Sequence, residues 1–115
     1  MTSKGKTHMA NNVFQLLEVR TGNLAITSID TEHWGSEVVV SCLYRYPPEE
    51  RPFKLRFQKV RNMQWITVKF DQTIDDAQVL THDIGEGDYQ RTARFATVLV
   101  EVVISYESVV VEKDW

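Results

Sequence analysis

The sequence contains a single cysteine, Cys42, in 115 residues. One thiol cannot form an internal disulfide, so no disulfide framework holds the fold together, and a reducing compartment such as the cytoplasm is the expected location. Long apolar runs are also missing. The longest candidate, residues 98–104, is interrupted by Glu101, and it falls far short of the roughly 20 residues that span a bilayer. These absences exclude a disulfide-rich scaffold and predict a protein without contact to membranes.

An excess of positive charge is likewise absent. The formal net charge is −3 at pH 7, from 13 basic and 16 acidic residues, whereas nucleic-acid-binding domains usually carry a basic excess. The sequence has neither a Gly-Lys-Ser/Thr phosphate loop nor a Gly-x-Ser-x-Gly nucleophile motif. Nothing in it therefore supports an enzyme or a cofactor, and binding to nucleic acid is not favoured.

Alternation of apolar and polar residues with a period of two is the clearest positive signal. In residues 53–58 every second side chain is apolar, namely Phe53, Leu55 and Phe57. A strand sends alternate side chains to opposite faces. This segment therefore predicts a strand with one buried and one solvated face, which is typical of antiparallel sheets.

The neighbouring segments extend this strand into a predicted central meander over residues 37–70. Residues 37–46 are rich in valine and tyrosine and predict a strand, which the proline-rich turn 47–52 joins to the next. After a turn at 61–64, the alternation resumes in residues 65–70. We expect these three strands to be neighbours in that order.

Further strands are predicted before and after the meander. Residues 13–20 and 24–29 flank a Thr-Gly-Asn turn and predict a first hairpin. Residues 77–82 predict a short strand. The run that begins at Phe95 fits both helical and strand spacing, but its many valines favour strands, followed by a last strand at 109–113.

These elements predict an all-β fold, or a β-rich α+β fold, arranged as one small antiparallel sandwich or barrel. We expect a single domain over residues 9–115, because the chain is too short for two independent cores. Residues 1–8 are polar and patternless, do not resemble a secretory signal, and are interpreted as a disordered tail or a remnant of a cloning site. Residues 96–106 are apolar on both strand faces, which favours a homodimer over a second sheet of the same chain as their cover.

Few residues suggest chemistry. Cys42 lies among valines, where a free cysteine is usually a small buried hydrophobe rather than a nucleophile. A zinc site would require His33, His82 and Cys42 to converge with a carboxylate, although their spacing matches no zinc motif. The acidic and glycine-rich residues 83–88 match no calcium-binding loop and predict a turn. No catalytic residue and no metal ligand are assigned.

The charged residues are segregated along the chain. From residue 51 to 69 all six charged residues are basic, and from 70 to 88 all six are acidic. One interpretation is a solvated face balanced by the acidic segment. The sharper interpretation is a docking patch for an acidic partner or RNA, formed by Lys54, Arg56, Lys59 and Arg61, although the absence of aromatic residues on the same strand face weakens the case for RNA.

Trp34 lies in a predicted loop, where it either caps an edge of the core or serves as an interface anchor. The leading hypothesis is a small cytoplasmic protein-interaction module, of the immunity type or another partner-binding type, with a protein partner or a second copy of the chain. The alternative is a small-ligand-binding β-barrel with an apolar cavity, which requires an enclosed pocket of roughly 300 Å³ or more.

Overall fold

The computed structural model describes residues 12–69, 76–85 and 91–115. The predicted tail at 1–8 and residues 70–75 and 86–88 of the acidic segment, the latter in the predicted turn, lie outside these residues. The elements follow in chain order: α1 (Val13–Leu17), β1 (Asn23–Glu32), the 3-10 turn η2 (His33–Gly35), β2 (Glu37–Tyr46), β3 (Glu49–Gln58), β4 (Asn62–Thr67), β5 (Ala77–Ile84), β6 (Arg91–Thr97), β7 (Val100–Tyr106) and β8 (Ser108–Glu112). The predicted all-β fold is confirmed.

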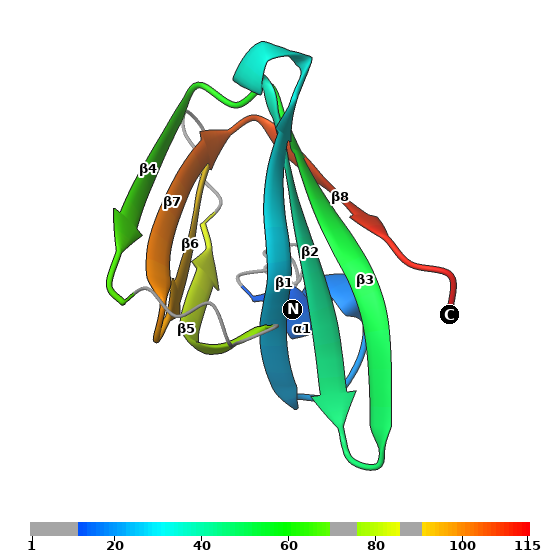
Figure 1. The fold of residues 1–115 in the computed structure, drawn as a ribbon. Helices are drawn as coiled ribbons and strands as arrows, with labels where there is room; N and C mark the ends of the chain where they lie inside the picture. The colour runs from blue at the N-terminus through cyan, green and yellow to red at the C-terminus, as the bar shows by residue number, and fades with distance from the viewer. Residues whose placement is uncertain (1–11, 70–75, 86–90) are drawn as a thin grey trace, which may run out of the picture.

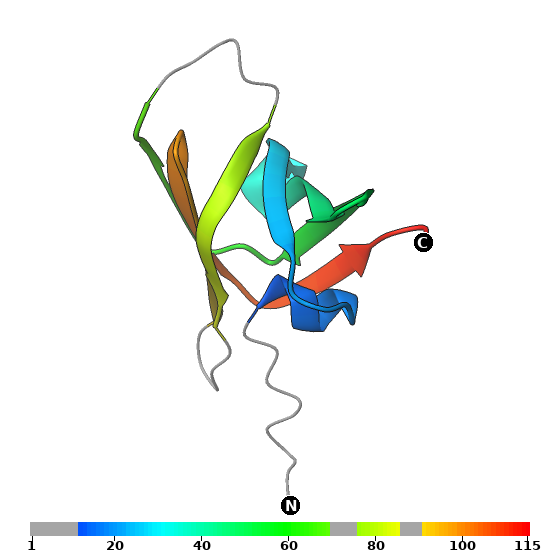
Figure 2. The ribbon, with the colours of Figure 1, turned by 90° about the horizontal axis from the view of Figure 1, so that it is seen from below.

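The strands form one antiparallel sheet in the order β4-β7-β6-β5-β1-β2-β3-β8. In the described part of the chain, the ladder between the two halves of the sheet comprises two residue pairs of β1 and β5, Ala25 with Gln78 and Ile26 with Ala77. At this junction the sheet bends, so that the halves face each other across a shared core (Figures 1 and 2). The outermost strands, β4 and β8, do not pair with each other, and the sheet is therefore not closed into a barrel.

The core lies between the two halves and is built by the alternation seen in the sequence. Phe53, Leu55 and Phe57 on β3 are 3%, 0% and 0% exposed, so the predicted buried face is confirmed. The Phe57 ring makes edge-to-face contacts with Phe95 of β6 and Tyr106 of β7, with ring centroids 6.2 and 4.9 Å away. These aromatic contacts across the core hold the two halves together.

The predicted meander is correct for two of its three strands. β2 and β3 pair along their full length, from Glu37 with Gln58 to Tyr46 with Glu49. β4 exists but does not lie beside β3, because the chain crosses to the other half of the sheet and pairs β4 with β7. Alternation specifies which face of a strand is buried, but it does not determine which strand lies beside it.

The predicted first hairpin is wrong, since residues 13–17 form the short helix α1. The side chain of Asn12 accepts a hydrogen bond from the backbone N–H of Gln15 at 2.9 Å, which caps the helix. Val13, Phe14 and Leu17 are buried against the core. β1 pairs instead with β2 through the η2 turn. Among the described residues, no helix has the length and apolarity needed to cross a membrane.

The C-terminal run forms strands, as its valines predict, but it is divided by a turn after Thr97. The Thr97 hydroxyl accepts hydrogen bonds from the backbone N–H groups of Leu99 and Val100, both at 3.0 Å. The residues expected in one strand are thereby distributed over β6 and β7. The buried face of β7, with Val102 and Ile104 fully buried, is covered by the other half of the same chain, so the fold does not need a second copy to bury it.

The contact between α1 and His82 of β5 predicts a pH-dependent stability. His82 Nε2 accepts a hydrogen bond from the backbone N–H of Val13 at 3.0 Å, and the imidazole stacks on Phe95 with ring centroids 6.3 Å apart. Burial lowers the pKa of His82 from its ordinary value of 6.5, and the nearby charge of Asp83 opposes this shift only in part. The folded protein prefers the neutral imidazole. The contribution of His82 to the stability of the folded state is therefore present above pH 6.5 and is lost as the pH falls through the lowered pKa.

We therefore expect the melting temperature to fall on acidification from pH 7 to about pH 5. The His82→Gln variant, whose side-chain oxygen accepts the same hydrogen bond, should lose this part of the pH dependence. His33→Gln is the control, since His33 is exposed and should leave the curve unchanged. Parallel curves for the wild type and His82→Gln in thermal melts across this range would contradict the assignment.

Candidate functional site

Trp34 is the most exposed large apolar residue among those described. It lies in the η2 turn at the tip of the β1–β2 connection, and its relative exposure is 107%. The backbone at the tip is unusual, with φ of 55° at His33, 62° at Trp34 and 90° at Gly35. For a residue with a side chain this left-handed region costs roughly 1–2 kcal/mol. Local backbone strain of this kind occurs frequently at functional positions, so the η2 turn is a candidate site.

Local hydrogen bonds between Ser36 and His33 order the backbone of this turn. The backbone N–H and the hydroxyl of Ser36 both donate to the carbonyl oxygen of His33, at 3.2 and 2.8 Å. The Trp34 ring is therefore presented to solvent by an ordered turn. Because the backbone of the turn is already ordered, a partner that covers the ring pays little for ordering the loop.

Two other turns lie at the same end of the molecule. The N–H of Val60, in the β3–β4 connection, donates to the carbonyl oxygen of Ser36 at 2.9 Å. The N–H of Glu107, in the β7–β8 turn, donates to the carbonyl oxygen of Gln58 at 3.0 Å. Figure 1 shows the three turns together at the top of the molecule. We call this region the Trp34 end, and it comprises Trp34, Lys59, Arg61, Arg91 and Glu107.

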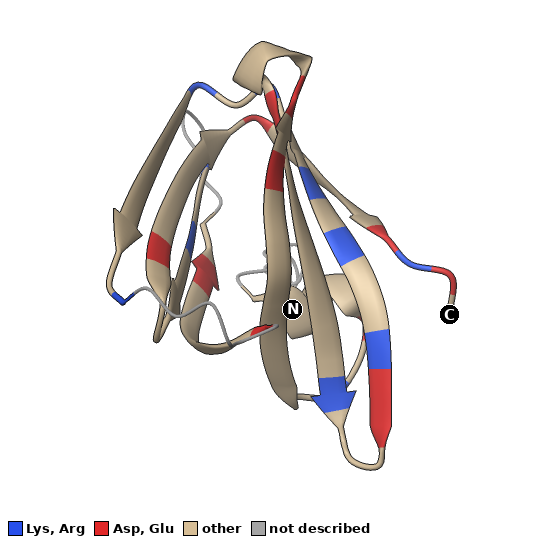
Figure 3. Ribbon diagram, in the orientation of Figure 1, with Lys and Arg blue, Asp and Glu red and all other residues tan. Residues whose placement is uncertain are grey.

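The Trp34 end combines the aromatic ring with basic groups. Lys59 and Arg61, whose side chains are 75% and 61% exposed, both lie close to the Glu107 carboxylate, at 3.3 and 3.4 Å. The Arg91 guanidinium donates to the backbone oxygen of Glu107 at 3.0 Å. Two cations thus approach the Glu107 carboxylate and a third contacts its backbone oxygen. Figure 3 marks the charged positions along the ribbon, and the region as defined carries a positive balance.

The structure therefore divides the predicted docking patch. Lys59 and Arg61 lie at the same end of the molecule as Trp34, so two independently predicted features occur in one region. Arg56 lies along β3 and donates to Glu32 at 2.7 Å, Glu37 at 3.1 Å and Glu112 at 2.8 Å. Its positive charge is already neutralised by carboxylates of β1, β2 and β8. The charge of Arg56 is thus compensated by carboxylates, as one interpretation predicted. The carboxylates are glutamates of three other strands and do not come from the acidic segment 70–88.

The carboxylates around Arg56 also show the effect of its charge. The hydrogen bond from Arg56, followed by its charge and that of Lys54, lowers the pKa of Glu112 against a smaller opposing effect of burial. The same hydrogen bond is the largest contribution that raises the pKa of Arg56. Through Arg56 the cluster links the ends of β1, β2 and β8.

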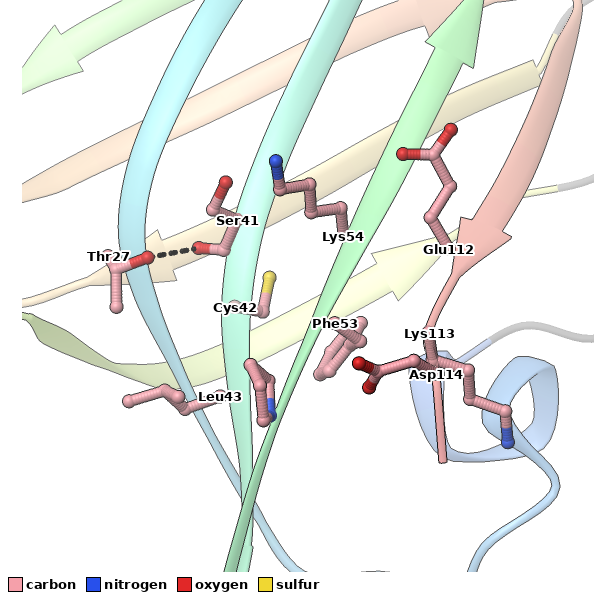
Figure 4. Close-up of a pocket in the computed structure, with 10 residues that line it drawn as sticks. Thr27, Ser41, Cys42, Leu43, Phe53, Lys54, Glu112, Lys113 and Asp114 are labelled. Carbon is pink, nitrogen blue, oxygen red and sulfur yellow. Dashed lines mark hydrogen bonds between the residues drawn. The ribbon is translucent and has the colours of Figure 1, made fainter.

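Lys54 lines a groove on the solvent side of β2 and β3. The groove has a volume of about 460 Å³, and Figure 4 shows its walls, which include Leu43, Lys54, Glu112 and Asp114. The Thr27 hydroxyl closes one side by donating to the Ser41 carbonyl oxygen at 3.1 Å. The groove opens to solvent on the outer face of the sheet, so it is not the enclosed cavity that a ligand-binding barrel would contain.

The residues weighed for metal or thiol chemistry lie in separate places. Cys42 is 4% exposed, and burial raises its pKa to about 12, so it is the buried apolar thiol that the sequence predicts. Within the described ranges, one group has metal-compatible spacing: Glu32, His33 and Glu37, with ligand atoms within 4.8 Å of one another. Arg56 holds both of these carboxylates, so a cation would have to displace it.

Comparisons with known proteins point to the fold alone. No protein-family model and no curated protein matches the chain. Among solved structures, the chain resembles the crystal structure of an uncharacterized protein from Neisseria gonorrhoeae, with a TM-score of 0.56 and 11% sequence identity. The match covers 83% of this chain and 95% of that chain, and at this identity it shows a likeness of fold alone.

Sequence reasoning found Trp34, Lys59 and Arg61 but missed Arg91. The position of Arg91 follows from its pairing with Tyr106 between β6 and β7, which brings it to the β7–β8 turn. No local pattern around Arg91 indicates this pairing, because the register between two strands is a property of the assembled sheet.

Proposed function

We propose that the protein is an interaction module that binds an acidic surface of a partner protein through the Trp34 end. The observation that carries the proposal is the complete exposure of the Trp34 ring on an ordered turn. Tryptophan is among the residues that contribute most to protein–protein binding when a partner covers them. The neighbouring cations Lys59, Arg61 and Arg91 would attract and orient an acidic partner.

The size of the chain is compatible with the same proposal. An immunity-type protein, which neutralises a toxin by surface complementarity, can be as small as this chain, and the single buried thiol suits a reducing compartment such as the cytoplasm. The alternative, a ligand-binding barrel, receives less support, because the sheet is open and aromatic rings of Phe57, Phe95 and Tyr106 occupy its interior.

The test is the Trp34→Ala variant. We expect binding of the partner to weaken by about thirtyfold or more, which corresponds to the 2 kcal/mol that defines a hot spot. The melting temperature should be unchanged, because the ring is fully exposed and alanine keeps the Cβ atom that causes the backbone strain. Cross-linking in native lysate would identify the partner, and calorimetry with the purified pair would measure the affinity.

The matched control is Leu80→Ala, which removes another exposed apolar side chain, 58% exposed, from β5. This variant should bind the partner as the wild type does. Equal affinities of Trp34→Ala and the wild type for the identified partner would exclude the Trp34 end as the binding site.

A further inference from the structure

The edge strand β4 carries a second surface suited to binding. β4 pairs with β7 on one side only and forms one end of the sheet order. Its sequence, Asn-Met-Gln-Trp-Ile-Thr, contains no charged residue, and Trp65 and Ile66 are 49% and 53% exposed. Proteins usually protect such an edge with charges, proline or a covering segment, and the other edge strand, β8, does carry a charged residue, Glu112.

The end of β4 is held firmly in place for pairing. The backbone N–H groups of Val68 and Lys69 both donate to the carbonyl oxygen of Leu99, at 2.7 and 3.0 Å. At the other end, the N–H of Arg61 donates to the carbonyl oxygen of Ser105 at 2.8 Å. The strand is thus fixed at both ends, and its unpaired backbone groups form a straight, ordered template for another strand.

A small apolar hollow lies beside this template. Trp65, whose neighbour across the ladder is the buried Val102, lines a hollow of about 200 Å³ together with Ile26, Ile29, Leu99 and Val100. A strand added to β4 would direct alternate side chains to the same face as Trp65. One apolar side chain of such a strand could therefore enter this hollow, as occurs when peptides bind to sheet edges.

Charge decides what kind of strand fits. The basic residues Lys59, Arg61 and Lys69 flank the uncharged stretch, and no acidic residue occurs from 59 to 69. Antiparallel pairing of two copies of β4 about Gln64 would place Lys59 opposite Lys69 of the second copy. Pairing about Trp65 would place Arg61 opposite Lys69 of the second copy. Like charges in opposite positions destabilise a strand pair, so a second copy is a poor occupant.

We propose that the β4 edge binds an extended peptide segment of a partner protein that is apolar at its centre and acidic at both ends. The segment adds a ninth strand beside β4, its backbone pairs with the free edge, and its acidic ends meet Arg61 and Lys69. This site shares Arg61, which lies 3.4 Å from Glu107, with the Trp34 end, but it does not include Trp34 and does not depend on the function proposed above.

The experiment uses the full chain labelled with nitrogen-15 and a synthetic probe peptide of alternating valine and threonine with two glutamates at each end. We expect the amide signals of residues 62–67 to shift on titration and to gain protection from hydrogen exchange. A peptide with lysines in place of the glutamates should bind at least about tenfold more weakly. N-methylation of the probe on alternate residues should abolish binding, because it removes the donors of the ladder.

Variants separate this site from the Trp34 end. Lys69→Glu should reduce the preference for the glutamate-ended probe, and Trp34→Ala should bind it as the wild type does. Shifts confined to β8 or to the Trp34 end, or no binding at all, would overturn the proposal. Concentration-dependent protection of β4 in the absence of probe would also overturn it, by assigning the edge to a second copy of the chain.

Discussion

Replacement of Leu55 by aspartate is expected to unfold the protein. Leu55 is 0% exposed in the centre of β3, and the loss of a buried leucine side chain alone costs about 2–5 kcal/mol. A carboxylate in the same place is without a partner, which adds several kcal/mol more. The sum is comparable to the whole stability of a small domain, about 5–15 kcal/mol.

The control is the identical substitution at Leu80, which is 58% exposed on β5. We expect Leu80→Asp to melt within a few degrees of the wild type, while Leu55→Asp shows no cooperative transition. Circular dichroism and thermal melts of the two variants provide the measurement. Similar melting curves for both would mean that the face assignment of β3 is incorrect.

Replacement of Arg56 by aspartate is expected to give the second large loss of stability. Arg56 is the shared partner of Glu32, Glu37 and Glu112, and the variant would place a fourth carboxylate among three. The pKa of Glu112 is lowered in the folded protein, so the stabilisation by Arg56 is present above the ordinary glutamate pKa and disappears as the pH falls through the lowered value. The difference in melting temperature between wild type and variant should thus be large at pH 7 and small in acid.

A matched comparison is Arg94→Asp, because Arg94 has one longer contact, to Glu101 at 3.7 Å, and its side chain is 56% exposed. Exposed pairs of this kind contribute little, so this variant should melt close to the wild type. Added salt should partly restore the stability of Arg56→Asp, since it screens the repulsion. If the two variants melt alike at neutral pH, the glutamate cluster does not support the fold in the way that the distances indicate.

The faces of the strands could be predicted from the sequence because they depend on local alternation. Phe53, Leu55 and Phe57 needed no information beyond their own spacing, and the valines after Phe95 were sufficient to distinguish strand from helix. Trp34 was recognised as an anchor candidate because a tryptophan between histidine and glycine does not continue a strand. In each case the residue type and its immediate neighbours determine the outcome.

The remaining features depend on which segments meet in space. Residues 13–20 were predicted as a strand because the Thr-Gly-Asn turn that follows them is typical of a hairpin. A helix as short as α1 is stable only when it packs on the core. The position of β4 was missed because nothing in its alternation distinguishes β7 from β3 as its neighbour. The three glutamates around Arg56 come from three strands. The sequence alone therefore does not reveal that they neutralise the charge of Arg56, because they meet only in the assembled sheet.

The position of β8 has a consequence for the rate at which the molecule assembles. β3 gains its outer neighbour only from β8, and the residues that join them, such as Arg56 and Glu112, are 56 positions apart. Contacts between such distant positions require large loops to close before they stabilise anything, which places this topology among slow folders, on the order of milliseconds to seconds. During synthesis the outer side of β3 stays uncovered until the C-terminal strand has left the ribosome, and the nascent chain is then most susceptible to aggregation.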